Sequence, residues 1–224
     1  MSQKEHCADI KKLLCPSMMC ADFGNLHGEV KALEEAGADI FHIDIMDGRF
    51  VPNFAMGAGD AQYIAAHTQK PTDAHLMINN PGDYVESFAK MGIGIIYIHP
   101  EADVHAPRTL EKIRRAGALP GIAVNPGTSA ETIGPLLSII SYLLVMTVNP
   151  GFAGQSYLPF VDGKIDRLIR LKDSYDYKLI IDGACSPERI RDLSARGADG
   201  FVLGTSALFG KNRPYANIFK ELRS

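Results

Sequence analysis

The chain has 224 residues, of which 46% are hydrophobic and 22% are charged, as in an ordinary soluble globular protein. Its net charge of -3 predicts no basic surface for nucleic acid or an anionic membrane, which favours small-molecule partners. No segment approaches the ~20 apolar residues of a membrane span, and the first residues lack the apolar core of a signal peptide. We therefore expect a cytoplasmic protein that binds neither membrane nor nucleic acid.

Eight short runs rich in aliphatic residues recur along the chain. Longer amphipathic runs lie between them, and several of these open on Ser, Asp or Pro and end at Gly, as helices do. The alternation predicts βα units and a parallel sheet. The predicted strands are residues 13–17, 39–46, 72–78, 94–99, 120–124, 142–148, 178–182 and 200–204, and the clearest helices are 27–37, 83–92, 106–117, 160–174 and 186–197.

Eight βα units without a linker or a change in composition predict one (β/α)8 TIM barrel, α/β in class, over residues 1–224, with residues 1–12 as an N-terminal extension. The alternative is an open doubly wound sheet. The first strand is followed by CADFGNLHGE, which lacks the G-x-G-x-x-G turn of dinucleotide-binding folds. The barrel is favoured, and functional sites of such barrels lie at the carboxyl ends of the strands.

The second predicted strand carries a polar face that burial alone does not explain. In FHIDIM, residues 41–46, three apolar side chains alternate with a His, an Asp and a Met, so the two sets lie on opposite faces. The apolar face of a barrel strand packs against helices, which directs His42 and Asp44 into the barrel near its mouth. The third strand repeats this pattern at His75 and Met77.

Two further strand ends contribute to this mouth, since the sixth strand carries Met146 and the seventh ends at Asp182. His42, Asp44 and His75 would then converge with Asp182. An isolated inward His or Asp is more often a hydrogen-bonded structural residue, but two buried carboxylates need a cation nearby. The four together predict one divalent transition metal ion, with zinc, iron, manganese and cobalt all compatible.

Glycine-rich turns follow the last three strands. They read NPGFAGQ after the sixth, DGACS after the seventh and GTSALF after the eighth. Glycine allows backbone N–H groups to surround an anion, and the loops after strands seven and eight of such barrels frequently hold phosphate. One such turn is weak evidence, but three neighbouring turns indicate a phosphorylated small molecule.

The positions of the two carboxylates suggest the reaction. Strands two and seven lie far apart around the ring, so Asp44 and Asp182 can flank a substrate from opposite faces. A metal that polarises a carbonyl acidifies the adjacent C–H, and a carboxylate beside it can remove that proton. Removal on one face and return on the other inverts the carbon, so we predict an epimerase acting next to a ketone.

These residues resemble the ribulose-phosphate 3-epimerase family and its close relatives, the allulose-6-phosphate 3-epimerases. The similarity runs from Cys15 to Phe209 through PSMMCADFGNL, HIDIMDGRFVPN, HLMI, VMTVNPGFAGQSY, IDGA and GTSALF. It implies a barrel of the ribulose-phosphate-binding type, interconversion of D-ribulose 5-phosphate and D-xylulose 5-phosphate through a cis-enediolate, and a homo-oligomer. Metal binding by His42, Asp44, His75 and Asp182 is implied as well, with the two Asp residues as the acid/base pair.

The resemblance also assigns contacts with the sugar phosphate. Three methionines would line the cis-enediolate, and the backbone of the glycine-rich turns would hold the phosphate. The implied substrate contacts are Ser17, His75, Met46, Met77, Met146, Gly151, Phe152, Ala153, Gly154, Gly183, Ala184, Gly204 and Thr205.

Departures from the family pattern concern the substrate. Where ribulose-phosphate epimerases usually read PGFGG, DGG and SILSAD, this chain has PGFAG, DGA and SMMCAD. Its FAG, VMT, HPE and GTS segments are similar to the allulose-6-phosphate branch. These changes surround the phosphate and the first strand, so they bear on sugar length and leave the chemistry unchanged. D-ribulose 5-phosphate is favoured because its epimerisation is the commoner activity, and D-allulose 6-phosphate is the alternative.

Other classes fit less well. A related decarboxylase or hexulose-phosphate synthase would show D-x-K-x-x-D at the second strand, where Met46 occupies the lysine position, and Lys178 lies at the wrong end of its strand for a Schiff-base aldolase. A non-catalytic sugar-phosphate-binding barrel would not need Asp182 as a second base. We interpret His99 and Glu101 as a hydrogen-bonded pair rather than a second metal site, with a supporting role for the pocket left open.

Overall fold

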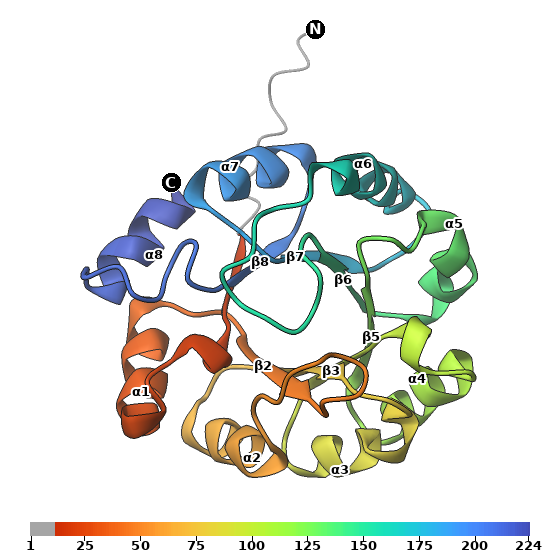
Figure 1. Cartoon of the computed structure of the whole chain (residues 1–224), viewed down its shortest axis with the longest axis horizontal. Coiled ribbons are helices and arrows are strands. Elements are labelled where there is room, and N and C mark those ends of the chain that lie inside the picture. Colours follow the sequence, from red (N-terminus) through yellow and green to blue (C-terminus); the bar gives the residue numbers. More distant parts are fainter. Residues whose placement is uncertain (1–11) are drawn as a thin grey trace, which may run out of the picture.

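The computed structural model describes residues 12–224 as one (β/α)8 barrel, in which a ring of helices surrounds the strands (Figure 1). The eight strands are parallel and form one sheet in the order β1-β8-β7-β6-β5-β4-β3-β2. The strands are β1 (Leu13–Pro16), β2 (Phe41–Met46), β3 (Thr72–Met77), β4 (Ile95–Ile98), β5 (Leu119–Val124), β6 (Tyr142–Met146), β7 (Lys178–Asp182) and β8 (Gly200–Leu203).

The helices follow the strands in turn. The α-helices are α1 (Leu26–Ala36), α2 (Ala58–His67), α3 (Val85–Lys90), α4 (Ala106–Arg115), α5 (Ala130–Ile133), α6 (Asp162–Leu171), α7 (Pro187–Arg196) and α8 (Tyr215–Arg223). Short 3-10 segments are η1 (Met18–Cys20), η2 (Phe23–Asn25), η3 (Pro81–Asp83), η4 (Pro100–Ala102), η5 (Gly134–Ile139) and η6 (Pro159–Val161).

The predicted barrel is confirmed, and every predicted strand overlaps an observed one. The sixth strand ends at Met146, two residues before its predicted end, because the chain turns there into the loop that lines the pocket. The five predicted helices correspond to α1, α3, α4, α6 and α7. The prediction did not single out α2, α5 and α8. Of the predicted N-terminal extension, residues 1–11 lie outside the described part of the chain.

Two apolar layers account for the alternating pattern of the strands. Phe41, Ile43 and Ile45 of β2 belong to the large core between sheet and helices, together with α1 residues such as Leu33. A smaller cluster fills the inside of the barrel around Tyr97. The predicted orientation of β2 is therefore confirmed, since its apolar side chains face the helix layer.

The barrel closes between β1 and β2 through contacts at the amino ends of these strands and one bridge farther along them. Asp39, just before β2, donates its backbone N–H to Leu14 O at 3.0 Å and accepts the Leu14 N–H on its carboxylate at 2.9 Å. Arg223 of α8 donates to the same carboxylate at 2.7 Å. Ser17 then forms an isolated parallel bridge with His42. This closure places the end of β1 beside the polar face of β2.

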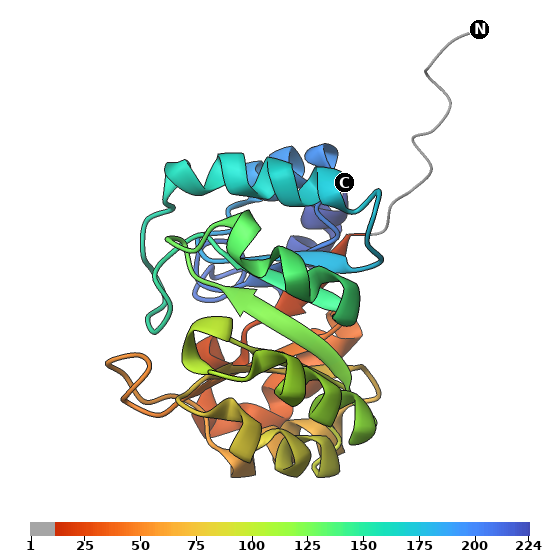
Figure 2. The same ribbon diagram turned by 90° about the vertical axis from the view of Figure 1, so that its right-hand side faces the viewer.

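One end of the barrel carries long loops after β2 and β6, which project from the same side of the molecule (Figure 2). The side-chain amide of Asn53 in the first loop donates to Gly151 O in the second at 2.7 Å. A Cβ at Gly151 would lie 3.0 Å from Val51 Cβ, so the close contact of the two loops requires a glycine there. Within residues 12–224, none of the helices has the length and apolar character needed to cross a bilayer.

Candidate active site

The pairing of β2 with β3 sets up a cluster of polar side chains inside the barrel mouth. In this parallel register His42 is the partner of Asp73, and Asp44 is the partner of His75. All four are almost completely buried. Asp182 comes from the end of β7, and its side chain reaches the same cluster.

Short distances connect the four predicted metal ligands. The Nε2 atom of His42 lies 3.2 Å from Asp44 Oδ1 and 4.0 Å from Asp182 Oδ2, and the Nδ1 atom of His75 lies 3.2 Å and 3.7 Å from the same oxygens. One ligand atom from each residue lies within 4.8 Å of all the others. The structure thus brings together the four side chains expected to converge.

The chemistry of this cluster fits a divalent cation. Two imidazoles and two carboxylates are a usual donor set for a transition metal. The Nε2 atom of His42 is buried, faces the two carboxylates and has no hydrogen-bond partner among the described residues. A bound cation would satisfy this nitrogen and offset the burial of two acidic groups.

The two carboxyl groups differ electrostatically although both are buried. For Asp44, burial raises the pKa, but the charge and close approach of His42 and a hydrogen bond with His75 outweigh this and hold the pKa well below its usual range. For Asp182, burial dominates over the opposing effect of His42 and raises the pKa to about 7. At neutral pH and without a cation, Asp44 is therefore ionised while Asp182 can hold a proton.

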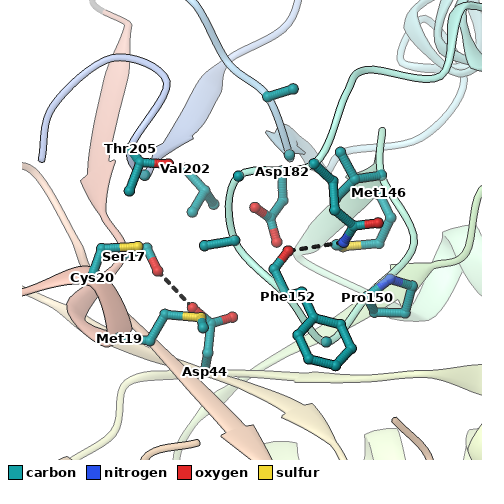
Figure 3. A pocket seen from close by; sticks show the side chains of 18 of the residues that line it. Ser17, Met19, Cys20, Asp44, Met146, Pro150, Phe152, Asp182, Val202 and Thr205 are labelled. Atoms are coloured by element: carbon teal, nitrogen blue, oxygen red, sulfur yellow. Dashed lines mark hydrogen bonds between the residues drawn. The ribbon is translucent and has the colours of Figure 1, made fainter. Parts of the chain in front are cut away.

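Ser17 supports this difference. Its hydroxyl donates to Asp44 Oδ2 at 2.7 Å, which satisfies the carboxylate oxygen that does not face the imidazoles (Figure 3). The carboxyl groups of Asp44 and Asp182 enter the pocket from different sides in this view. The predicted substrate residue Ser17 thus also orients one of the two acids.

Asp73 contributes to the site without being part of the predicted set. Its Oδ1 lies 2.7 Å from His42 Nδ1, and the residue is 1% exposed. A carboxylate can only accept, so it favours the proton of His42 on Nδ1 and leaves Nε2 for the cluster. Burial lowers the pKa of His42, but Asp73 and Asp44 raise it well above its usual value. Asp73 lies two residues before His75 and so shares its face of β3, but only the strand register reveals its partner.

A pocket lies over the cluster. His42 and His75 have no exposed surface and do not line it, but they contact Asp44, which does. All the other predicted site residues line it, namely Ser17, Asp44, Met46, Met77, Met146, Gly151, Phe152, Ala153, Gly154, Asp182, Gly183, Ala184, Gly204 and Thr205. Met19 lines the pocket as well, and so do five further residues of the three predicted glycine-rich turns, namely Asn149, Pro150, Gln155, Cys185 and Ser206. Sequence analysis did not single out the lining residues Cys20, Val148 and Val202.

The turn after β7 has the backbone shape of an anion site. Gly183 and Ala184 both adopt left-handed conformations, with φ of 111° and 48°. The hydroxyl of Thr147 donates to the carbonyl oxygens of Asp182 and Gly183, which anchors this turn to the end of β6. No lysine or arginine occurs among the described residues that line the pocket. Backbone N–H groups and hydroxyls are therefore the donors available to a phosphate there.

Comparisons with known proteins agree with this site. The sequence model described as the ribulose-phosphate 3 epimerase family matches residues 13–209. Ribulose-phosphate 3-epimerase of Synechocystis is 40% identical over 216 residues, covering 95% of this chain and 93% of the relative. The enzyme of the same name from Bacillus subtilis is 38% identical over 202 residues, covering 89% and 93%.

Among solved structures, the tryptophan synthase A-subunit of Pyrococcus furiosus superposes with a TM-score of 0.69 over 96% of each chain. At 16% identity this similarity shows the fold alone. The family match and the two curated relatives, in contrast, extend over most of the chain. The chain belongs to the ribulose-phosphate 3-epimerase family and is an isomerase that epimerises a carbohydrate.

Proposed function

We propose that this chain is a metal-dependent 3-epimerase that interconverts D-ribulose 5-phosphate and D-xylulose 5-phosphate. The observation that carries the proposal is the pair Asp44 and Asp182, which reach one pocket from β2 and β7 with pKa values displaced in opposite directions. Inversion by two bases needs an ionised carboxylate on one face of the substrate and a protonated carboxyl on the other. Without a bound cation, the imidazoles around Asp44 and the burial of Asp182 shift the two pKa values in these opposite directions.

His42, Asp44, His75 and Asp182 would hold one divalent transition metal ion. When bound, the ion polarises the ketone and stabilises the negative charge that develops on its oxygen. Asp44 takes the proton from carbon 3, which gives the cis-enediolate, and Asp182 delivers a proton to the opposite face of that carbon. In the reverse reaction the two residues exchange roles.

Other pocket residues bind and enclose the substrate in this proposal. Met46 and Met77 pack with Val51, and Met146 belongs to the apolar cluster inside the barrel, so the reacting carbons would meet thioether groups instead of water. The backbone N–H groups of the turns after β6, β7 and β8 would bind the phosphate. A family whose relatives are named for ribulose phosphate supports a sugar phosphate as substrate.

A second candidate substrate is D-allulose 6-phosphate. Ala153 and Ala184 lie in the phosphate turns at positions where pentulose-phosphate epimerases usually have glycine. Ala184 adopts a left-handed conformation despite its Cβ, which indicates that the turn is held in this shape by its surroundings. The additional methyl groups alter the cradle without touching the carboxylates, so they bear on sugar length only.

The test is epimerisation kinetics on metal-loaded protein with both ketose phosphates measured side by side and a chelator control. A higher kcat/KM on D-ribulose 5-phosphate, abolished by the chelator, would support the main proposal, and the reverse preference would assign the hexulose phosphate. Turnover that survives complete metal removal would contradict metal dependence. Turnover of neither compound would favour a non-catalytic sugar-phosphate-binding barrel.

A further inference from the structure

A third imidazole lies behind the proposed metal ligands. His99 follows β4 and has no exposed surface. Its Nε2 atom lies 2.8 Å from Nε2 of His75, on the side of that ring away from Asp44 and Asp182. The ring of Phe50 covers His99 with 4.7 Å between ring centroids. His99 does not line the pocket, so it contacts the proposed metal ligand His75 and not the substrate.

Glu101 determines which nitrogen of His99 carries the proton. Its Oε1 accepts hydrogen bonds from the Asn125 N–H at 3.0 Å and from the Thr128 hydroxyl. Its other oxygen, Oε2, lies 3.5 Å from His99 Nδ1, a buried nitrogen that has no hydrogen-bond partner among the described residues. A carboxylate can only accept, and a neutral imidazole carries a single N–H. The proton of His99 therefore lies on Nδ1, and its Nε2 is left as an acceptor.

This arrangement favours one tautomer of His75 in turn. With Nε2 of His99 as acceptor, the proton of neutral His75 lies on its own Nε2. Without a cation, Asp44 Oδ1 competes for this proton, because it lies at hydrogen-bond distance, 3.2 Å, from His75 Nδ1. In the tautomer favoured by His99, the Nδ1 lone pair faces the cluster, where Asp44 Oδ1 and Asp182 Oδ2 lie 3.2 Å and 3.7 Å away. The opposite tautomer would place a proton at this nitrogen and block it as a ligand.

We propose that His99 and Glu101 are positioning residues, which hold His75 with its Nδ1 lone pair directed at the metal. The proposal rests on the proposed metal-dependent function and deepens it, because it makes metal affinity depend on two residues outside the ligand set. Glu101, on η4, would thus act on a ligand in β3 through a single intervening ring.

A purely structural role for the pair is the competing explanation, and the chain offers a control for it. Glu101 also fixes the loop after β5 through Asn125 and Thr128. Lys164 of α6 fixes the same loop by donating to the carbonyl oxygens of Asn125, Pro126 and Thr128 at 2.6, 3.1 and 3.0 Å. Lys164→Met would loosen this loop without removing either member of the pair.

The experiment is a Zn²⁺ titration of metal-free protein in competition with a chromophoric chelator, with the melting temperature of each metal-free variant as a check of folding. We expect His99→Leu to weaken Zn²⁺ binding about 10- to 100-fold, as for other residues that support a ligand. In His99→Gln the amide oxygen can accept from His75, so most of the affinity should return. Lys164→Met should leave the Zn²⁺ affinity unchanged.

Glu101→Gln tests which nitrogen of His99 carries the proton, with almost no change in side-chain volume. Its amide oxygen would accept from the Asn125 N–H, which turns the NH₂ group toward His99 Nδ1. Both imidazoles would then adopt the opposite tautomers, so we expect a loss of Zn²⁺ affinity similar to that of His99→Leu. This variant also decides the question if His99→Leu does not fold.

Unchanged Zn²⁺ affinity in folded His99→Leu or in Glu101→Gln would overturn the proposal. An equal loss of affinity in Lys164→Met would also overturn it, because loop order alone would then explain the effect. If the wild-type protein itself binds no divalent metal, the proposed metal-dependent function fails before any variant is compared.

Discussion

The two halves of the barrel mouth are built from different chemical groups. On the side of β2, β3 and β4, buried side chains face one another, such as His42 with Asp73 and His75 with His99. On the side of β6, β7 and β8, the pocket is lined mainly by the glycine-rich segments that follow these strands. The reacting groups thus depend on the identity of particular side chains. The anion site depends instead on small residues and on backbone with positive φ.

Asp182 joins the two halves, and its loss should have the largest effect. In Asp182→Asn the second base is missing while the volume is retained, so we expect kcat to fall by about 10²- to 10⁴-fold, the usual contribution of a general acid or base. Steady-state epimerisation and a thermal melt would check activity and folding together. Turnover close to the wild-type rate in a folded protein would rule out the two-base assignment.

Asp73 tests the side of β2, β3 and β4, where buried side chains support the proposed metal ligands. In Asp73→Asn the anion beside His42 Nδ1 is lost, and we expect metal affinity to fall by about 10- to 100-fold. Chelator competition measures this directly. Asp199→Asn is a matched control, since Asp199 is also buried but is bonded to Lys172 and to the Leu179 N–H. The control should lower the stability and leave metal affinity unchanged, so equal losses in both variants would contradict the role of Asp73.

Much of this site could be predicted from periodicity and residue type. The period of two in β2 and β3 is sufficient to direct His42, Asp44 and His75 into the barrel, because adjacent parallel strands bring their inward residues to one level. The glycine that ends several helices is also a local signal, and Gly37 and Gly197 adopt φ of 101° and 119° at these positions.

The remaining features depend on contacts that no local pattern encodes. The contact between His75 and His99 requires two particular ring orientations on neighbouring strands. Lys164 reaches carbonyl groups almost forty residues away in sequence, which only the closed ring of helices makes possible. The single-turn helix α5 is too short for a periodic pattern to reveal. The sequence therefore predicts which residues face the pocket more readily than which ones support them.

Gly183 tests the side of β6, β7 and β8, where backbone groups would bind the phosphate. Its φ is 111°, and an added Cβ would lie 2.7 Å from Val148 Cγ2 and 3.0 Å from Thr147 Oγ1. Gly183→Ala should therefore distort the turn and raise the KM for the sugar phosphate about tenfold, the effect of losing one hydrogen bond to a charged group. Metal affinity should not change. Gly127→Ala, where a Cβ meets nothing within 4 Å, is the control, and an unchanged KM in Gly183→Ala would exclude this turn from phosphate binding.

The smallest expected effect is on the free energy of unfolding. It tests whether the buried polar residues on the side of β2, β3 and β4 also stabilise the fold. Burial raises the pKa of Glu101, but the nearby His99 ring and the hydrogen bond from the Thr128 hydroxyl outweigh this and lower it from 4.5 to about 2. Because the folded protein binds this proton more weakly than the unfolded chain, the stabilisation is complete above pH 4.5 and is lost as the pH falls toward 2. Urea unfolding of metal-free wild type and Glu101→Gln should show the difference in unfolding free energy shrinking over this range, by at most about 1.4 kcal/mol per pH unit. A difference that stays constant with pH would mean that the Glu101 charge orients His99 without stabilising the barrel.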